Sequence, residues 1–444
     1  MGSSEYGFYF SLLSFSLLFN ILLDIGITNF NNRSLSQNPS LIKDYFSNIV
    51  VVKLLLALVY GIISFAVALA MGYETRQLNL LVVLIFNQFL SSFLLYLRSN
   101  ISGLQFYTTD SLLSVLDRGI MIVLCSLMIW GHILHQPLKI EWFVYVQSIS
   151  YLAAMLIIGT VLYTKTKKLT FVVDWKKIIH IVRQIAPYAI LGLLMSIYTR
   201  TDSVLIERLL PDGKTQAGIY AQSFRILDAF SNFSLLFASL LLPMFSRLLV
   251  TKEDFVPLLK TSFSLLLLMC LALSLPCFAF SKPIIYALYH EGSDYSASVF
   301  SILILSFIPI SVNYIFGTLL TANGSLKLLN YAAAVAVCLN IILNLVLIGH
   351  YKVLGAAIAN LVTQSMIAIA QIALCFTLWK YKLTKKTILK YSLFVITSAT
   401  VTYSCLIMAG PWVMRFLSAI LVIGLLSLVT GVLSFKQIFK AIKL

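Results

Sequence analysis

Four ionisable side chains lie within two successive apolar stretches of the chain, and they are the residues most able to do chemistry. Arg225 and Asp228 fall in one stretch, and Arg200 and Asp202 fall in the stretch before it. A charged side chain at the centre of a bilayer costs about 3 kcal/mol, so it is retained where it faces protein, water or a bound ion. A guanidinium can hold phosphate oxygens through two hydrogen bonds. The two arginines are therefore candidate ligands for a phosphate-bearing substrate.

The spacing of these four residues predicts how they are arranged. Arg200 and Arg225 each lie roughly 12 Å below the same membrane surface if both stretches are helical. Arg225 and Asp228 are three residues apart and share a helix face, whereas Arg200 and Asp202 are two apart and do not. The arginines could line a cationic cavity, or all four residues could form ion pairs that fix the packing. Asp202 and Asp228 are better suited to be charge partners than to contact substrate or a coupling cation.

A further acid and a further base lie near the inner ends of the first two apolar stretches. Asp24 is close to the end of 6–28, and Lys53 is roughly 8 Å inside the end of 48–71. The two side chains could pair, Lys53 could bind a pyrophosphate as it enters, or its ammonium could reach the interface along its flexible stem. Asp24 is also a candidate for coupling to a driving ion.

The composition excludes a soluble protein. Hydrophobic residues make up 60% of the 444 residues, charged residues 11%, and the mean hydropathy is +0.95. We therefore expect an all-α polytopic membrane protein of about thirteen transmembrane helices, each of about 20 residues. The predicted spans are 6–28, 48–71, 78–97, 112–132, 140–163, 186–208, 217–245, 262–282, 296–320, 329–349, 354–379, 388–408 and 412–434.

The basic residues predict the topology. Of the 32 Lys and Arg residues, 23 lie on the inner side and 7 on the outer side if the C-terminus is cytoplasmic, with Arg200 and Arg225 inside the membrane. This bias is typical of a membrane protein with its C-terminus in the cytoplasm. The net charge of +16 thus reflects topology and does not indicate nucleic acid.

No catalytic or metal-binding constellation is visible, so we expect neither an enzyme nor a bound cofactor. The six cysteines all lie in apolar spans and lack disulfide or zinc spacing. His132 and His135 form an isolated H-x-x-H in a short loop. A membrane glycan polymerase, the enzyme alternative, typically needs a long outer loop with basic or catalytic residues. The longest outer loop here, 283–295, is short and acidic.

An internal repeat organises the chain into two lobes. Tyr6–Gly7–Phe8–Tyr9 resembles Ala217–Gly218–Ile219–Tyr220, and four later spans match at similar offsets. Parallel repeats of this kind are typical of transporters with a central site between two lobes. The predicted domains are an N-terminal lobe at 1–163, a C-terminal lobe at 186–380, and a C-terminal helix pair with a basic tail at 381–444.

Residues 164–185 are predicted to join the lobes as an amphipathic helix on the inner membrane surface. The spacing of Trp175, Ile178, Ile179 and Val182 gives that segment its apolar face, and Asp174 is its predicted N-cap. The second lobe has a span, 186–208, that lacks a counterpart in the first. We therefore expect that one helix before Met1 is missing; a natural thirteen-span protein is the alternative.

Several short motifs resemble one family in their order and spacing. They are Ser4–Glu5–Tyr6–Gly7–Phe8–Tyr9, Asp24–Ile25–Gly26, Thr201–Asp202–Ser203, Ala217–Gly218–Ile219–Tyr220–Ala221 with Arg225, and Leu354–Gly355–Ala356–Ala357–Ile358–Ala359. The chain resembles the Wzx-type polysaccharide (O-antigen or capsule) flippases of the multidrug/oligosaccharidyl-lipid/polysaccharide exporter superfamily. In that family the acidic-aromatic-Gly motif follows a first helix, which agrees with a missing helix here.

The resemblance implies two six-helix lobes and a substrate class. The family moves polyprenyl-pyrophosphate-linked oligosaccharides, of the undecaprenyl type, from the inner to the outer leaflet for surface polysaccharide biosynthesis. Arg225 matches the position of a functional arginine in related lipid II flippases, and Arg200 and Lys53 are the other candidate pyrophosphate ligands. Implied partners are the lipid-linked oligosaccharide, membrane lipid and glycan polymerase or assembly proteins. A cation-coupled multidrug antiporter of the same superfamily is the alternative function.

Overall fold

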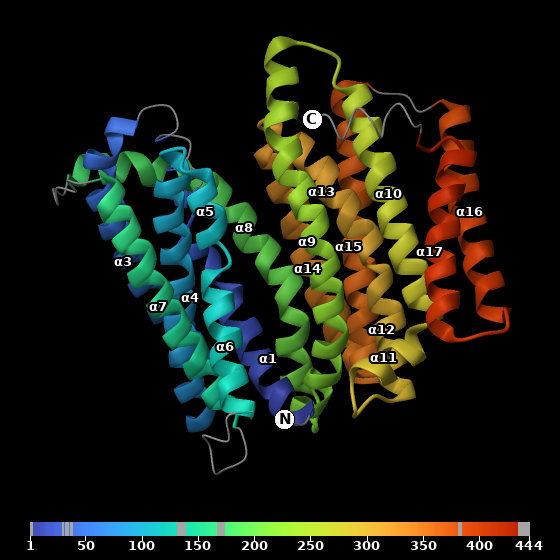
Figure 1. Ribbon diagram of the computed structural model, residues 1–444, viewed down its shortest axis with the longest axis horizontal. Helices are drawn as coiled ribbons and strands as arrows, with labels where there is room; N and C mark the ends of the chain where they lie inside the picture. Colours follow the sequence, from blue (N-terminus) through green and yellow to red (C-terminus); the bar gives the residue numbers. More distant parts are fainter. Residues whose placement is uncertain are drawn as a thin grey trace. The chain divides into compact units, whose positions relative to one another are not determined.

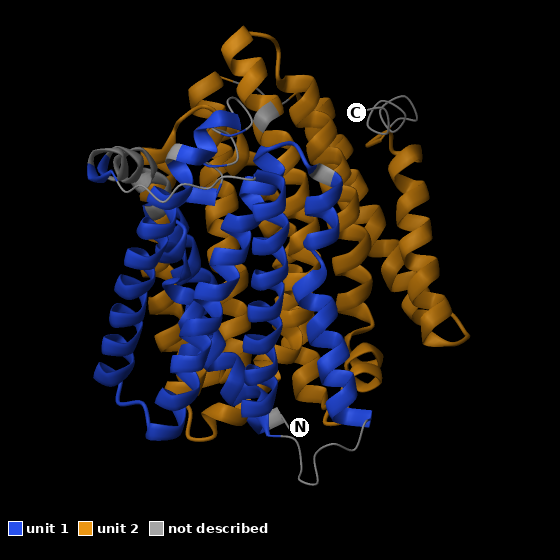
Figure 2. Ribbon diagram, turned by 60° about the vertical axis from the view of Figure 1, so that its left-hand side comes forward, with its two compact units in different colours: residues 1–204 blue, residues 205–444 orange. Residues whose placement is uncertain are grey.

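The computed structural model describes residues 3–28, 31, 35, 39–130, 139–166, 174–380 and 384–433. Within these ranges the regular elements are all helices, which confirms the predicted all-α membrane fold (Figure 1). The chain forms two compact units, residues 1–204 and 205–444 (Figure 2).

The helices of the first unit are α1 (Ser3–Leu18), the 3₁₀ turns η1 (Asn20–Leu23) and η2 (Pro39–Leu41), α3 (Ile42–Ala70), α4 (Thr75–Gly103), α5 (Tyr107–Leu113), α6 (Leu116–Trp130), α7 (Ile140–Thr166) and most of α8 (Trp175–Leu209). The second unit contains α9 (Gly213–Thr251), α10 (Val256–Ala279), α11 (Ser281–Leu288), α12 (Asp294–Leu305), α13 (Phe307–Ala322), α14 (Leu326–Tyr351), α15 (Val353–Trp379), α16 (Lys385–Ile407) and α17 (Trp412–Val429).

Ten helical segments in the described ranges are long and apolar enough to cross a membrane. The predicted spans 6–28, 186–208 and 388–408 are helical but do not meet that criterion. The first is broken, because α1 has only 16 residues. In the second, the side chains are described only from residue 190 onward, and the third is diluted by the Ser, Thr and Tyr residues of α16.

The core of the first unit is built where α4 packs along α7 and α1 (Figure 1). Phe8, Leu12 and Phe15 of α1 are buried in one apolar cluster with Leu81 and Leu84 of α4. These residues recur every three to four positions, so each helix presents one apolar face to its neighbour. A second cluster surrounds the start of α3 and the end of α4.

The chain leaves α-helical geometry just after α1. Residues Asn20–Leu23 form a 3₁₀ turn, and Ile25 and Gly26 follow with φ of 50° and 85°. Left-handed backbone suits glycine but is uncommon for a β-branched residue such as Ile25. The Asp24–Ile25–Gly26 motif therefore marks a break in the predicted first span, and α3 and α4 pack directly against η1.

The predicted interlobe segment is not a separate helix over its described residues. Helix α8 begins at Trp175, directly after the predicted N-cap Asp174, and continues without interruption to Leu209. It therefore joins the second half of the predicted linker to the predicted span 186–208. The division between the two units falls inside α8, after Val204. Residues 167–173 of the predicted linker lie outside the described residues.

In the second unit, α14 and α15 pack at close range because small residues line their contact. Gly355, Ala356, Ala357 and Ala359 of the sequence motif are all buried. A Cβ atom added at Gly355 would lie 2.2 Å from the backbone oxygen of Leu347. Small residues let membrane helices approach closely, so this motif has a packing explanation.

Replacing Gly355 with Ala should destabilise the second unit. The added methyl group meets backbone, which cannot rotate away as a flexible side chain could. We expect a loss of about 1–3 kcal/mol, typical of overpacking, measured as a lower thermal unfolding midpoint of the purified protein. Gly349→Ala is the matched control, since nothing lies within 4 Å of an added Cβ there. Equal stability of the two variants would contradict the close approach.

Candidate functional site

Asp24 and Lys53 form an ion pair beside the break that follows α1. The ammonium of Lys53 donates to the carboxylate of Asp24 and also to Ser92 of α4, at 2.9 Å to Oγ and 3.3 Å to the carbonyl oxygen. The hydroxyl of Ser92 in turn donates to the carbonyl oxygen of Leu23, at 3.1 Å. The pair therefore joins the 3₁₀ turn η1 to both α3 and α4.

The Asp24 carboxylate also accepts two hydrogen bonds from Thr28, four residues later in the chain. The hydroxyl of Thr28 donates to Oδ1 of Asp24 at 2.5 Å, and the Thr28 backbone N–H donates to Oδ2 at 3.3 Å. After the break that follows α1, the hydroxyl and the backbone N–H of Thr28 thus both point toward Asp24. Discontinuous membrane helices are often where transporters place substrate and ion sites.

The two side chains of this ion pair are buried to different extents, and this decides how much each depends on the other. The side chain of Lys53 is 1% exposed and that of Asp24 is 28% exposed. Val52 and Leu94, close to Lys53 and Ser92 in sequence, belong to the surrounding apolar cluster. An ammonium buried among apolar side chains is tolerated when it is paired and its N–H groups are hydrogen-bonded. Of the alternatives for Lys53, the structure shows pairing with Asp24 and excludes an ammonium that extends to the interface.

Arg200 and Asp202 lie on different sides of α8, as expected for helical residues two apart. Val204 packs in the apolar cluster with Phe8 and Tyr9 of α1. Arg200, one turn earlier, lies near that same face and is partly buried. Asp202 is fully buried and lies about 160° around the helix from Val204. The structure therefore gives these two residues different surroundings.

Arg225 lies on the face of α9 that points away from the other helices of its own unit. Leu227, Ser234 and Leu241 are buried where α9 packs against α12 and α13. The hydroxyl of Ser234 lies 2.8 Å from that of Ser311 in α13. These residues lie about 160–200° around the helix from Arg225, and the Arg225 side chain is exposed.

Asp228 shares the polar face of α9 with Arg225. It is partly buried, and the amide of Asn232 donates to its backbone oxygen at 2.9 Å. Ala229 and Asn232 on this face are exposed. The predicted i, i+3 relation of Arg225 and Asp228 holds because α9 is continuous from Gly213 to Thr251. Polar side chains such as Arg225 and Asp228 on one face of an apolar helix must meet water or a partner group if the helix crosses a membrane.

A cluster that sequence reasoning missed lies at the other end of the first unit. Arg76 contacts Glu5 through two hydrogen bonds, at 2.8 and 3.1 Å, and Glu141 at 2.9 Å. Its guanidinium also lies 4.7 Å from the centre of the Phe8 ring. The cluster gives Glu5 of the Ser4–Tyr9 motif a structural role in joining α1, α4 and α7. Arg76 and Glu5 are both exposed, so the cluster contributes little stability.

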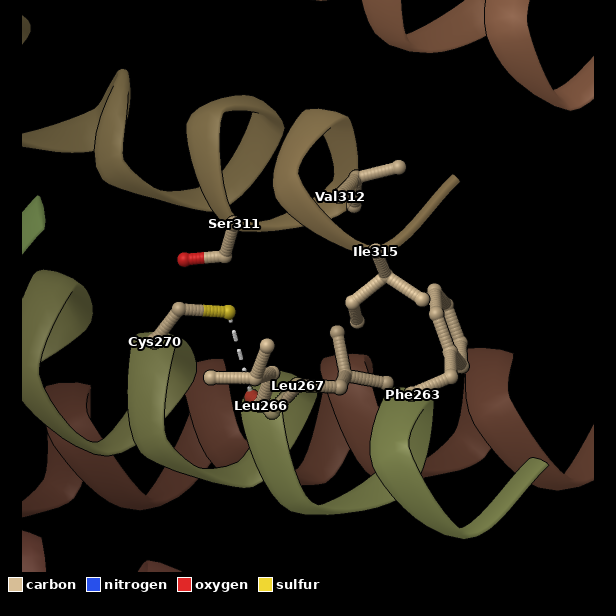
Figure 3. Close-up of a pocket in the computed structure, with 7 residues that line it drawn as sticks. All are labelled: Phe263, Leu266, Leu267, Cys270, Ser311, Val312 and Ile315. Carbon is tan, nitrogen blue, oxygen red and sulfur yellow. Dashed lines mark hydrogen bonds between the residues drawn. The ribbon is translucent and has the colours of Figure 1, made fainter. Parts of the chain in front are cut away.

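The second unit contains a narrow apolar gap between α10 and α13, which is too tight to hold even a water molecule. Its lining is Phe263, Leu266, Leu267, Cys270, Ser311, Val312 and Ile315 (Figure 3). The two polar groups are already bonded: Cys270 donates to Leu267 O and Ser311 to Phe307 O. The gap therefore has no cation to bind a phosphate group.

Ser92, Glu5 and Glu141 are the contact residues that sequence reasoning did not assign. Ser92 is an ordinary helix residue in sequence, and only its position opposite Lys53 gives it a role. Within the described ranges no group of three His, Cys, Asp or Glu residues is placed to hold a metal ion. The His132 and His135 pair lies outside these ranges.

Comparisons with known proteins agree on family and fold. The model of a family described as polysaccharide biosynthesis protein matches residues 1–249, more than half of the chain. No curated protein sequence matches significantly. The solved structure of the lipid II flippase MurJ in an inward closed conformation is 15% identical, with a TM-score of 0.67, and the match covers 97% of this chain and 96% of that one.

Two multidrug transporter structures are also similar. An inward-facing MATE family transporter of the MOP superfamily is 17% identical, with a TM-score of 0.62 and 84% and 92% coverage of this chain and that one. The Vibrio cholerae MATE transporter VcmN is 14% identical, with a TM-score of 0.60 and 85% and 89% coverage. At these identities the likeness shows the fold and leaves the substrate open. The chain belongs to the polysaccharide biosynthesis protein family, with the multi-pass fold of the flippases and exporters of the MOP superfamily.

Proposed function

We propose that the protein moves a polyprenyl-diphosphate-linked oligosaccharide from the inner to the outer leaflet of a bacterial cytoplasmic membrane, for O-antigen-like or capsular polysaccharide. The observation that carries the proposal is the match to the polysaccharide biosynthesis family, on a chain with an exporter fold. The residues most relevant to substrate binding are arginines within apolar helices. Arg225 on the exposed face of α9 is the main candidate.

In this proposal Arg225 and Arg200 neutralise the diphosphate in a water-filled cavity, while the prenyl tail stays in lipid. Asp202 and Asp228 act as charge partners of the arginines. Guanidinium groups suit this task because their paired N–H groups match two phosphate oxygens. The sugar portion then crosses the membrane as the lobes change which side of the cavity is open.

Lys53 takes part at an early step of the same proposal. Its ammonium is bound to Asp24, so the diphosphate of an arriving substrate would compete with this carboxylate for the same N–H groups. Exchange of one anion for another leaves the buried ammonium compensated throughout. Since the pair lies at the break after α1, release of Asp24 would remove its ionic link to α3 and leave the Ser92–Leu23 hydrogen bond to hold the 3₁₀ turn. Asp24 is then also the residue best placed to respond to a proton or another coupling cation.

The membrane potential favours outward movement of an anion. A negative charge that leaves a negative cytoplasm gains about 2.3 kcal/mol per 100 mV. If the arginines neutralise the substrate, the loaded step is nearly electroneutral, and the potential draws the empty cationic cavity back. The proposed orientation has the C-terminus in the cytoplasm, in accord with the Lys and Arg bias.

The alternative proposal is a multidrug antiporter, which the MATE structures support at the level of fold. A test in bacterial cells distinguishes the flippase function from the antiporter function. A bacterial strain that lacks its polysaccharide flippase should regain surface polysaccharide when it expresses this protein and the cognate glycosyltransferases. Drug resistance without restored polysaccharide would favour the antiporter and contradict our proposal.

A further inference from the structure

Three lysines from two helices meet at one end of the second unit. Lys260 lies near the start of α10, and Lys386 and Lys390 lie in the first two turns of α16. The positive charges of Lys260 and Lys386 both act on Lys390, whose side chain is partly desolvated. Helices α10 and α16 pack against each other, so these three lysines form one cationic cluster, which we call the α10–α16 lysine cluster.

The positions of these lysines are fixed by contacts between the two helices. The hydroxyl of Tyr391 in α16 lies 2.9 Å from the hydroxyl of Ser264 in α10. The Tyr391 ring also meets Phe263 edge to face, with centroids 5.1 Å apart. Lys260 is one turn before Ser264, and Lys390 is next to Tyr391, with its Nζ 5.9 Å from the centre of the Tyr391 ring. The cluster is thus built around a defined interhelical contact.

The arrangement is electrostatically unfavourable by itself. Like charges repel each other, and cations near the start of a helix also oppose the positive end of the helix dipole. Lys385 and Lys386 occupy the first turn of α16 after its N-cap Thr384. Neither α10 nor α16 contains an Asp or Glu residue. An anion bound by the lysines would relieve this repulsion.

The surface beside the cluster indicates where that anion comes from. Ile388, Leu389, Leu393 and Ile396 of α16 are between 49% and 69% exposed. In a membrane these side chains contact acyl chains, so the lysines lie where the acyl chains end and the headgroups begin. Basic pockets between helices on the cytoplasmic side are known sites for anionic lipid headgroups. The charge bias of the chain places this end of α16 on that side.

We propose that the α10–α16 lysine cluster binds the phosphate group of an anionic lipid in the inner leaflet. The site is separate from Arg225 and does not depend on the proposed function. The phosphate could come from a phospholipid such as phosphatidylglycerol or from a polyprenyl diphosphate, since both present the same oxygens to lysine. Lys386 and Lys390 are the main ligands, and Tyr391 fixes their position through Ser264 and Phe263.

The test measures lipid binding by the purified full-length protein in neutral detergent, with native mass spectrometry to count retained lipids. The probes are phosphatidylglycerol, phosphatidylcholine with the same chains, and farnesyl diphosphate. The wild type should retain at least one anionic probe in preference to phosphatidylcholine. The variant Lys386→Gln/Lys390→Gln should bind that probe about thirty-fold more weakly, since each lysine near the membrane surface contributes about 1 kcal/mol.

Two matched variants keep the outcome interpretable. Arg247→Gln/Lys327→Gln removes the same charge from exposed positions elsewhere in the second unit, and it should bind like the wild type. Lys386→Arg/Lys390→Arg retains the charge and should retain most of the affinity. The anionic probe that binds identifies the source of the phosphate. The proposal is overturned if the wild type binds anionic and zwitterionic lipid equally well. It is also overturned if Lys386→Gln/Lys390→Gln and Arg247→Gln/Lys327→Gln weaken binding of the anionic probe by the same factor.

Discussion

Replacing Arg225 with Ala should abolish export of the lipid-linked glycan while the amount of protein in the membrane stays unchanged. Arg225 lies on the exposed face of α9, opposite the face that packs against α12 and α13, so its removal leaves that packing intact. Its loss removes the proposed bidentate partner of the diphosphate. Charge-assisted hydrogen bonds contribute about 1.5–3 kcal/mol each, so export should fall at least tenfold. Surface polysaccharide in a flippase-deficient strain is the measurement.

The chain provides a close control for this variant. Arg247 is also exposed and lies on the same helix, about 33 Å farther along its axis. Arg247→Ala should retain export, and Arg225→Lys should recover part of it, because lysine keeps the charge without the two-pronged geometry. Full export by Arg225→Ala would refute the assignment of Arg225 to the substrate.

Replacing Asp24 with Asn should destabilise the first unit strongly. The amide keeps the shape of the carboxylate but leaves the ammonium of Lys53, only 1% exposed, without its counter-charge. Removal of one partner from a buried ion pair costs about 3–5 kcal/mol, a large part of a total stability of about 5–15 kcal/mol. We expect a markedly lower unfolding midpoint and less protein in the membrane.

The second substitution at this pair separates stability from function. Asp24→Asn/Lys53→Met removes both charges and should recover most of the lost stability. If Lys53 also receives the diphosphate, this double variant should be stable and still deficient in export. Glu253→Gln, at an exposed acid of the second unit, should leave the unfolding midpoint unchanged. A stable Asp24→Asn protein, or a double variant less stable than the single one, would show that the pair does not hold the broken helix.

Much of the fold follows from hydrophobic length alone, but the continuity of individual helices does not. The apolar stretches predict nearly all the helices, because a span must bury about 20 residues in lipid. The break at Asp24–Ile25–Gly26 is a local backbone event, stabilised by Lys53 and Ser92 from distant parts of the sequence. Its repeat partner α9 runs unbroken for 39 residues. The sequence echo between these two spans therefore does not extend to helix geometry.

The site residues show a similar division between local and long-range information. That Arg225 and Asp228 share a face follows from helical spacing, and the continuous α9 confirms it. Pairing of Asp24 with Lys53 is one of several arrangements that the sequence allows, because nothing in the sequence places η1 against α3. The roles of Ser92 and Arg76 required the structure, since Ser and Arg residues of this kind occur throughout the chain.

Transfer of a lipid-linked oligosaccharide across vesicles tests the central proposal most directly. The purified protein would be reconstituted with a polyprenyl-diphosphate-linked oligosaccharide, and an impermeant glycosidase would report how much glycan is accessible from outside. In protein-free vesicles only the outer-leaflet share, about half, should be cleaved. We predict that the wild type makes nearly all of the glycan accessible and that Arg225→Ala stays near the protein-free value. Cleavage that stops at the protein-free value with the folded wild type would contradict the proposed flippase activity.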